Sequence, residues 1–242
     1  MELSIIIVNF KTDKLVADCV ASIKKNTKVK HEVIVIDNSI DNKGFAKANN
    51  IGIDKAKGKY VLLLNSDTVV KKNAIDKLLE FAKTKDDAGV IAPKLLNKDG
   101  SVQDSVFYFP TIVNAIKEFW FGQKGLFGLY VPKVNEPIEV DAVVGAAFLI
   151  TPKALEKVGK LNEKYFFYYE DLDYCREIWK SGLKVYYLPD AEVIHLKGAS
   201  GKSLANEDQQ WKRLIPSSKI YNGLVKYYIL FFIMWIGQKI GK

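Results

Sequence analysis

The sequence predicts an α/β fold: a single, mainly parallel central sheet flanked by helices, followed by a C-terminal helical extension. Three observations lead to this prediction. Short apolar runs of strand length alternate with helical segments, the runs are apolar at nearly every position, and no internal repeat or low-complexity linker interrupts them. Strands that are apolar throughout are typical of a parallel sheet buried on both faces. A chain of 242 residues, 48% of them hydrophobic, is large enough for one such domain.

The first half of the chain predicts strands and helices in regular alternation. The opening helix begins near Thr12 or Asp13, and Gly58 ends the second helix. The predicted strands cover residues 3–8, 32–36, 60–64 and 89–92, and the later helices cover 45–57 and 73–83.

The second half is less regular. It predicts strands at 101–109, 139–150, 184–188 and 192–195 and helices at 152–158 and 170–181, while the aromatic stretch 119–130 predicts no element. We expect one domain over residues 1–197 and an extension over 198–242.

Composition excludes several classes of protein. With 26% charged residues and a large apolar fraction, the chain is neither disordered nor a disulfide-stabilised miniature. Its only cysteines, Cys19 and Cys175, lie in separate helical segments, so we expect a reducing compartment. The amino terminus runs straight into a strand, so we expect no signal peptide.

Most of the net charge of +8 lies in the extension, because residues 197–242 hold eight basic and two acidic residues. This balance predicts an anionic partner, either nucleic acid or a membrane surface. The ten consecutive apolar residues Tyr227–Ile236 favour the membrane. That run is too short to cross a bilayer, which needs about 20 apolar residues.

Two helices are expected in the extension. Asn206 and Gln209 form a capping-box pattern that opens the first, Pro216 interrupts it, and Ser217 or Ser218 starts a second that ends near Lys239. The aromatic residues Tyr227, Tyr228 and Trp235 and the flanking lysines suit a membrane interface. The alternative is a helix packed on the domain or on a second copy of the chain.

Polar residues follow three neighbouring strands, where an open α/β sheet binds its ligands. Asn9 follows the first strand, Asp37 and Asn38 follow the second, and Asn65–Ser66–Asp67 follows the third. Each of these residues alone could simply start a turn or cap a helix. The chain lacks both glycine-rich phosphate-binding motifs, so we expect a metal ion to hold any bound phosphate, with Asp67 as its ligand.

A second group of carboxylates follows an aromatic run in YFFYYEDLDYC, residues 165–175. Acidic residues in a first helical turn are favoured by the helix dipole alone. Here the aromatic residues would exclude water and raise the pKa of a carboxyl toward that of a general base, with Asp171 the main candidate and Asp173 the alternative. His195 ends the last predicted strand, where it is either structural or a ligand.

Six segments follow the order and spacing of one known family, glycosyltransferase family 2: SIIIVNFKTDKLVADCVASI, EVIVIDNSIDN, GFAKANNIGI, YVLLLNSDTVV, VVGAAFLITPKAL and FFYYEDLDYCREIWKSGLKVYYLPDAEVIH. The chain resembles this family, and its rhamnosyltransferase-like branch in particular, over about residues 3–200. The resemblance implies a GT-A fold with residues 1–197 as the catalytic domain. It also implies inverting transfer from a nucleotide-sugar donor and a divalent cation, Mg²⁺ or Mn²⁺.

The resemblance also assigns roles. Asp37 would accept a hydrogen bond from the nucleotide base. Asp67 would be the metal-binding carboxylate at the end of a D-x-D-like motif. Asn65 replaces the first Asp of that motif in this chain. Asp171 would be the general base, and His195 a second metal ligand. The residues expected around the nucleotide sugar are Asn9, Asp37, Asn38, Asn49, Asn65, Ser66, Asp67, Gly145 and Glu170.

We therefore expect an inverting, metal-dependent glycosyltransferase that acts on a hydroxyl of a lipid-linked or polysaccharide acceptor. A UDP or dTDP donor is favoured, because one carboxylate at Asp37 fits the N3–H of uracil or thymine, but guanine could use the same carboxylate. We expect it in the cytoplasm, peripheral on the inner face of the cell membrane, with no nucleic acid as partner. One alternative is a non-catalytic nucleotide-sugar-binding or scaffold protein at the membrane surface, which loss of the carboxylates at 67 or 171 would have favoured. The other is a nucleotidyltransferase, which would favour a glycine-rich phosphate loop. The nature of the sugar and the role of residues 107–139 leave no signal in the sequence.

Overall fold

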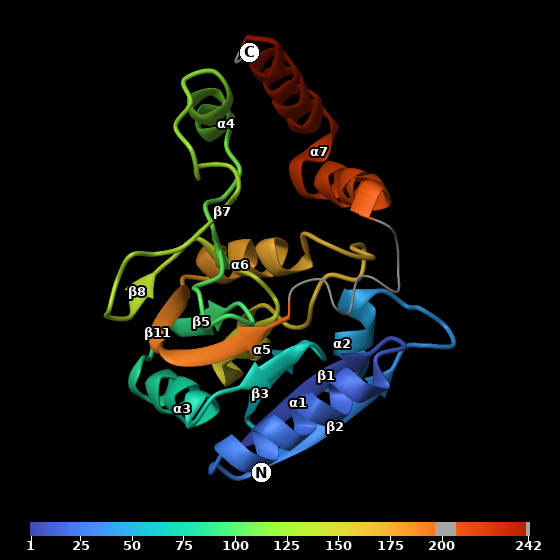
Figure 1. Ribbon diagram of the computed structural model, residues 1–242, viewed down its shortest axis with the longest axis vertical. Coiled ribbons are helices and arrows are strands. Elements are labelled where there is room, and N and C mark those ends of the chain that lie inside the picture. Colours follow the sequence, from blue (N-terminus) through green and yellow to red (C-terminus); the bar gives the residue numbers. More distant parts are fainter. Residues whose placement is uncertain (197–206, 241–242) are drawn as a thin grey trace.

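A central eight-stranded sheet forms the body of the protein in the computed structural model, which describes residues 1–196 and 207–240 (Figure 1). Five strands run in one direction and three run against them, so the predicted mainly parallel sheet is confirmed. The strands are, in sheet order, β2 (His31–Asp37), β1 (Leu3–Asn9), β3 (Tyr60–Leu64), β10 (Ala147–Ile150), β5 (Ala88–Leu96), β11 (Lys184–His195) and β4 (Thr68–Val70), and β8 (Ile138–Glu139) pairs with β11.

Helices cover both faces of this sheet, which explains the uninterrupted apolar runs. In β1, Ile5 and Ile7 belong to one core and Ile6 to the other, because successive side chains of a strand point to opposite faces. The first core is closed by α1 (Asp13–Asn26) and α3 (Ala74–Thr84). The second is closed by α2 (Phe45–Lys55), α5 (Pro152–Lys157) and α6 (Glu170–Lys180).

Several predicted strands have different bounds. β11 is one strand where two were predicted, because the chain passes Pro189 through an irregularity between Leu188 and Glu192. The predicted strand 139–150 is broken, since the chain turns at Gly145 between β9 (Ala142–Val143) and β10. The predicted strand 101–109 is reduced to β6 (Val106–Phe107) and a bridge at Val102.

A small second sheet, which the sequence did not predict, follows from these changes. It pairs β6 with β9 and with β7 (Leu129–Tyr130), and it lies at the base of α4 (Ile112–Phe119). Residues 107–139, whose role the sequence left open, therefore begin in the second sheet, form α4 and rejoin the central sheet at β8.

Helix α7 (Glu207–Ile240) consists of two segments that meet at Gly223, where φ is 70° and ψ is 159°. The predicted interruption at Pro216 is wrong, because Pro216 lies inside the first segment. The break falls at Gly223 because a residue without Cβ adopts this backbone conformation at little cost. The predicted cap at Asn206 lies outside the described residues.

By length and composition alone, the stretch Leu214–Lys239 could cross a membrane. The ten-residue apolar run Tyr227–Ile236, taken by itself, predicted a segment too short to cross a bilayer. The break at Gly223 divides this stretch into two unequal parts.

The second segment of α7 packs against α4 and stands away from the sheet with it (Figure 1). Leu230 and Ile233 bury Ala115, and the indole nitrogen of Trp120 donates to the carbonyl of Ile233 at 2.9 Å. We call residues 112–127 and 224–240 the arm.

Candidate functional site

The polar strand ends predicted from the sequence do meet at one edge of the sheet. β1 and β2 are parallel and pair Asn9 with Asp37, so both strands end together. β3 ends at Leu64, directly before Asn65. His195 ends β11 and pairs with Thr68 of β4, which brings it to the same edge.

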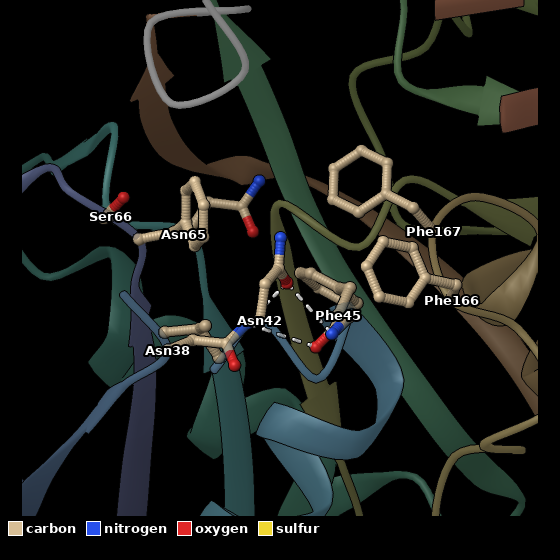
Figure 2. Close-up of a pocket in the computed structure, with 10 residues that line it drawn as sticks. Asn38, Asn42, Phe45, Asn65, Ser66, Phe166 and Phe167 are labelled. Carbon is tan, nitrogen blue, oxygen red and sulfur yellow. Dashed lines mark hydrogen bonds between the residues drawn. The ribbon is translucent and has the colours of Figure 1, made fainter. Parts of the chain in front are cut away.

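A pocket opens beside this edge (Figure 2). Its cavity volume is about 70 Å³, far below the several hundred Å³ of a site that encloses a whole ligand. It is therefore large enough for only part of a ligand the size of a nucleotide sugar. The pocket is lined by Val8, Phe10, Asn38, Asn42, Gly44, Phe45, Asn65, Ser66, Phe166 and Phe167.

One side of the pocket is polar and the other is aromatic. Asn65 and Ser66 lie on one side, and the rings of Phe166 and Phe167 lie opposite them (Figure 2). Phe45 stands edge-on to Phe167, with ring centroids 6.4 Å apart. Amides beside aromatic rings suit a polar ring such as a nucleobase or a sugar.

A network of carboxamides shapes the floor of the pocket. Asn38 donates to the side-chain oxygen of Asn42 at 3.1 Å, and that oxygen also accepts the backbone N–H of Gly44 at 3.0 Å. Gly44 has a φ of 81°, and a Cβ there would lie 2.3 Å from the carbonyl oxygen of Phe166. Only glycine therefore lets the start of α2 approach residues 165–169, which we call the aromatic loop. There the backbone N–H of Phe45 donates to the same carbonyl oxygen of Phe166 at 2.9 Å.

Two predicted donor-binding residues are already engaged within the fold. The side-chain oxygen of Asn9 accepts from the backbone N–H and the hydroxyl of Thr12, and its amide donates to Asp13. The amide of Asn49 donates to the carbonyl of Phe45 inside α2. Neither residue lines the pocket.

Asp37 is exposed at the end of β2 and lies outside the enclosed part of the site. The hydroxyl and the backbone N–H of Ser39 hold the pKa of its carboxyl below the usual value. The group is therefore an ionised hydrogen-bond acceptor at neutral pH.

Asp67 and His195 form a buried pair. The carboxylate oxygen of Asp67 lies 3.4 Å from Nε2 of His195, and both residues are buried. The other ring nitrogen of His195 lies 2.7 Å from the side-chain oxygen of Gln103, whose amide donates to the carbonyl of His195. Gln103 thereby fixes the orientation of the imidazole, as outer-sphere residues do in metal sites.

This pair fits a divalent cation that also binds phosphate. Among the described residues, no three His, Cys, Asp or Glu side chains converge as a complete metal site. One carboxylate and one imidazole are nevertheless a sufficient protein contribution for Mg²⁺ or Mn²⁺ when substrate phosphates and water supply the remaining ligands.

Glu170 and Asp171 begin α6 and have different surroundings. Asp171 accepts the backbone N–H of Gly145 at 2.9 Å and its neighbour Leu172 at 2.8 Å. Glu170 is 6% exposed, and its Oε2 has no hydrogen-bond partner among the described residues.

These surroundings set the order in which the two groups ionise. Burial, with the adjacent Asp171, raises the pKa of Glu170 well above its usual range. Burial also raises the pKa of Asp171, but the two N–H donors oppose that shift. Asp171 therefore ionises at a lower pH than Glu170.

Gly145 and Ala146 connect Asp171 to the edge of the sheet. The backbone N–H of Asn65 donates to the carbonyl of Ala146 at 2.9 Å, and the N–H of Gly145 donates to Asp171. The carboxylate of Asp171 is thus tied to the strand end that bears Asn65, two residues before Asp67.

The alternative carboxylate, Asp173, is engaged elsewhere. It forms an ion pair with Arg176 and accepts a hydrogen bond from Asn162 at 3.2 Å. It lines a separate cleft between α6 and the start of α7. Asp173 therefore does not share the site of Asp171.

The aromatic loop before α6 is strained. Tyr168 and Tyr169 both have positive φ, 69° and 71°, which costs non-glycine residues on the order of 1–3 kcal/mol each. Contacts with the first segment of α7 help to hold it: Ser217 donates to the carbonyl of Phe167 at 2.9 Å, and the hydroxyls of Tyr169 and Ser218 lie 3.2 Å apart.

Sequence reasoning missed several residues of the site. Asn42, Gly44, Phe45 and the pair Phe166–Phe167 line the pocket, and Gln103 orients His195. Asn42 and Phe45 lie next to motifs that the sequence did single out. Gln103 carried no signal, because its partner is 92 residues away.

Comparison with known proteins gives consistent similarities. A family model described as glycosyltransferase like family 2 matches residues 5–213. A low-salt glycan biosynthesis hexosyltransferase of Haloferax volcanii is 27% identical and aligns with 80% of this chain and 67% of its own length. An N-acetylglucosaminyl-diphospho-decaprenol L-rhamnosyltransferase of Mycobacterium tuberculosis is 31% identical over 58% of this chain and 48% of its own length. The chain thus spans about half to two thirds of these relatives.

Among solved structures, GalNAc-T7 with UDP, GalNAc and Mn²⁺ is similar with a TM-score of 0.63 and 19% identity. The similarity covers 81% of this chain and 44% of that chain. It confirms the GT-A fold that the sequence resemblance implied.

Proposed function

The chain belongs to glycosyltransferase family 2, and from this we propose that it is an inverting glycosyltransferase that transfers a sugar from a nucleotide-sugar donor to a hydroxyl group. A UDP or dTDP donor is favoured, because one carboxylate at Asp37 matches the N3–H of uracil or thymine. The observation that carries the proposal is Asp171: a carboxyl group that the backbone N–H of Gly145 fixes, that is tied to the polar edge of the sheet, and that ionises before its neighbour Glu170.

The donor would lie along the edge of the sheet. Asp37, exposed at the end of β2, would accept a hydrogen bond from the base, and the pocket would enclose one ring of the donor between its amide and aromatic walls. Asn38, Asn65 and Ser66 are the polar groups on that path. Asn9 and Asn49 act indirectly, by holding the starts of α1 and α2.

Asp67 and His195 would hold Mg²⁺ or Mn²⁺, with Gln103 orienting the imidazole. When bound, the cation would supply Lewis-acid stabilisation of the negative charge on the leaving diphosphate.

The acceptor hydroxyl has a pKa far above 7, so it must lose its proton as it attacks. Asp171 takes that proton while the hydroxyl oxygen forms a bond to the anomeric carbon. The bond from that carbon to the diphosphate oxygen breaks with its electron pair, and the nucleoside diphosphate leaves. Attack opposite to the leaving group inverts the anomeric centre. General-base assistance of this kind contributes about 10²–10⁴-fold.

We propose a lipid-linked or polysaccharide acceptor and a location on the cytoplasmic face of the membrane. The mycobacterial relative is named for a diphospho-decaprenol-linked substrate. The apolar C-terminal helix of this chain, with its excess of basic residues, supports peripheral association with a membrane.

Asp171→Asn tests the proposal, because it keeps the shape of the side chain and removes its basicity. A panel of UDP and dTDP sugars identifies the donor by binding, and transfer or slow donor hydrolysis is then measured. We expect turnover to fall at least about 10²-fold while donor affinity stays near that of the wild type. Wild-type turnover in this variant would refute the role of Asp171, and failure of every UDP and dTDP sugar to bind would refute the proposed donor.

A further inference from the structure

Exposed apolar side chains are concentrated on the arm. More than half of the described exposed large apolar residues belong to it, although it is a small part of the chain. Val225 is 77% exposed in α7, and Phe121, at the end of α4, is 72% exposed. Soluble monomers rarely leave so many neighbouring apolar groups in water unless they bind something.

The two elements of the arm form one unit. Ala115 is buried under Leu230 and Ile233, and Gly237 lies directly against Phe119. The loop after α4 returns through Glu118, whose carboxylate accepts the backbone N–H groups of Leu126 and Phe127. Because α4 packs on α7, the two elements would enter a bilayer together.

The exposed face of α7 is broad. At about 100° per residue, its exposed apolar positions from Leu224 to Trp235 cover an arc of about 160°, on the side opposite α4. A partner helix needs a narrower stripe than this. A bilayer interface accepts a broad face rich in Tyr, Trp and Phe.

The charge pattern selects the same partner. From Gln209 to Lys242 the chain holds six basic residues and no acidic one. Lys239 lies 3.7 Å from the centre of the Trp235 ring, which places an aromatic group and a cation side by side as at a membrane interface. The one carboxylate of the arm, Glu118, is engaged by its own loop.

We propose that the arm inserts into a lipid bilayer as one unit, with exposed apolar side chains of α4 as well as α7 entering the interface. Val113 and Phe121 of the α4 part would enter the interface together with the apolar face of α7. This inference deepens the membrane location proposed above, because it makes residues 112–121, which precede α7 by about a hundred positions, part of the membrane contact.

Co-sedimentation with vesicles of phosphatidylcholine and about 30% phosphatidylglycerol tests the surface. Val113→Glu and Phe121→Glu each place a carboxylate in it, and we expect each to lower the bound fraction at least about tenfold. Ile40→Glu is the matched control, because Ile40 is apolar and 97% exposed on the body of the protein. Its binding should equal that of the wild type, and thermal melting should show all three variants folded.

Tryptophan fluorescence gives a second readout that needs no charged variant. A protein that keeps only Trp120 of its four tryptophans should be quenched by brominated lipid. One that keeps only Trp179, whose indole donates to the carbonyls of Val140 and Asp141 in the body, should not be quenched.

Two results would overturn the proposal. In one, the α4 variants sediment with vesicles like the wild type, and in the other, the wild-type protein does not sediment with vesicles. A wild-type dimer that the α4 variants convert to monomer without any vesicle binding would assign the arm to a second copy instead. Vesicle binding requires no catalysis, so a protein that binds vesicles but transfers no sugar would refute the proposed activity and leave this inference standing.

Discussion

Glu170 and Asp171 are consecutive carboxyl groups that differ in the hydrogen bonds their oxygens accept, and this difference affects their pKa values. Asp171 has two backbone donors and Glu170 Oε2 has none among the described residues, so burial acts on the pair unequally. The result is that Asp171 ionises more readily than Glu170, and unequal surroundings of this kind are a common way in which enzymes separate two similar groups.

Glu170→Gln should lower turnover by less than about tenfold, whereas Asp171→Asn should lower it at least about 10²-fold, because Gln replaces a carboxyl that is already neutral. The pH profile of kcat/KM should rise through the raised pKa of Asp171, at a higher pH than for an ordinary aspartate. Equal losses in the two variants would contradict the different roles assigned to Glu170 and Asp171.

Stability provides the control for that experiment. A carboxyl whose pKa is raised in the folded state favours folding while protonated, and this stability is lost as the pH rises through the folded-state pKa. The melting temperature of Glu170→Gln relative to the wild type should therefore increase with pH. A constant difference would contradict the protonated state assigned to Glu170.

Gln103 contacts His195 twice and is expected to act on the metal only through it. Gln103→Leu should raise the Mn²⁺ concentration for half-maximal activity at least about tenfold, because the imidazole loses its orientation. Metal titration of chelated enzyme measures this, with Gln123→Leu, an exposed position, as the control. An unchanged metal requirement with a lower melting temperature would make Gln103 purely structural.

At the scale of single residues, the sequence was informative where a candidate site residue follows a strand or lies at the start of a helix. Asp37, Asn65, Asp67 and Asp171 were identifiable because their places after apolar runs are visible in the chain itself. Gln103 and Asn42 were not, because their roles depend on contacts with residues that the fold brings near.

Among the elements, α7 serves two parts of the molecule. Its first segment holds the aromatic loop through Ser217 and Ser218, and Tyr221 packs against Tyr169 with ring centroids 5.3 Å apart. Arg176 of α6 donates to the carbonyl of Tyr221. Its second segment belongs to the arm.

Two truncations separate these parts. A chain that ends at Gly223 should keep the stability and donor hydrolysis of the full protein. A chain that ends at Pro216 loses the contacts of Tyr221, so its free energy of unfolding should fall by about 2–4 kcal/mol, and donor hydrolysis should be slower. Urea unfolding and a hydrolysis assay measure both. Equal behaviour of the two chains would show that the first segment does not support the loop.

The sequence predicted the central strands well because each is long, apolar and clearly ended. It failed where elements depend on pairing: β4 and the strands of the second sheet have only two or three residues each, too few for a periodic signal. The break in α7 was misplaced because Pro216 is the stronger sequence signal, while the backbone turns at Gly223.

In the whole molecule, the arm lies at one end and the central sheet at the other (Figure 1). The aromatic loop lies between them and is hydrogen-bonded to α7. If the arm rests on a bilayer, a lipid-linked acceptor reaches the site by diffusion in two dimensions rather than three. Membrane binding would then raise its effective concentration at the site.

Phe121→Glu should therefore raise the KM for a lipid-linked acceptor in vesicles by about tenfold or more and leave kcat near that of the wild type. The KM for a short soluble acceptor should not change, because Phe121 lies outside the pocket. An equal rise for both acceptors would mean that the arm acts on the site itself.

The non-helical residue at Gly223 also sets how the C-terminal region tolerates changes in length. One residue inserted within a helix rotates everything beyond it by about 100°, which would turn Leu230 and Ile233 away from α4. An insertion at Gly223 is absorbed there, because that residue already lies outside the helical repeat. The rotation of the second segment of α7 about its axis is thus independent of the first segment, which contacts the aromatic loop. The two segments can therefore diverge separately in evolution.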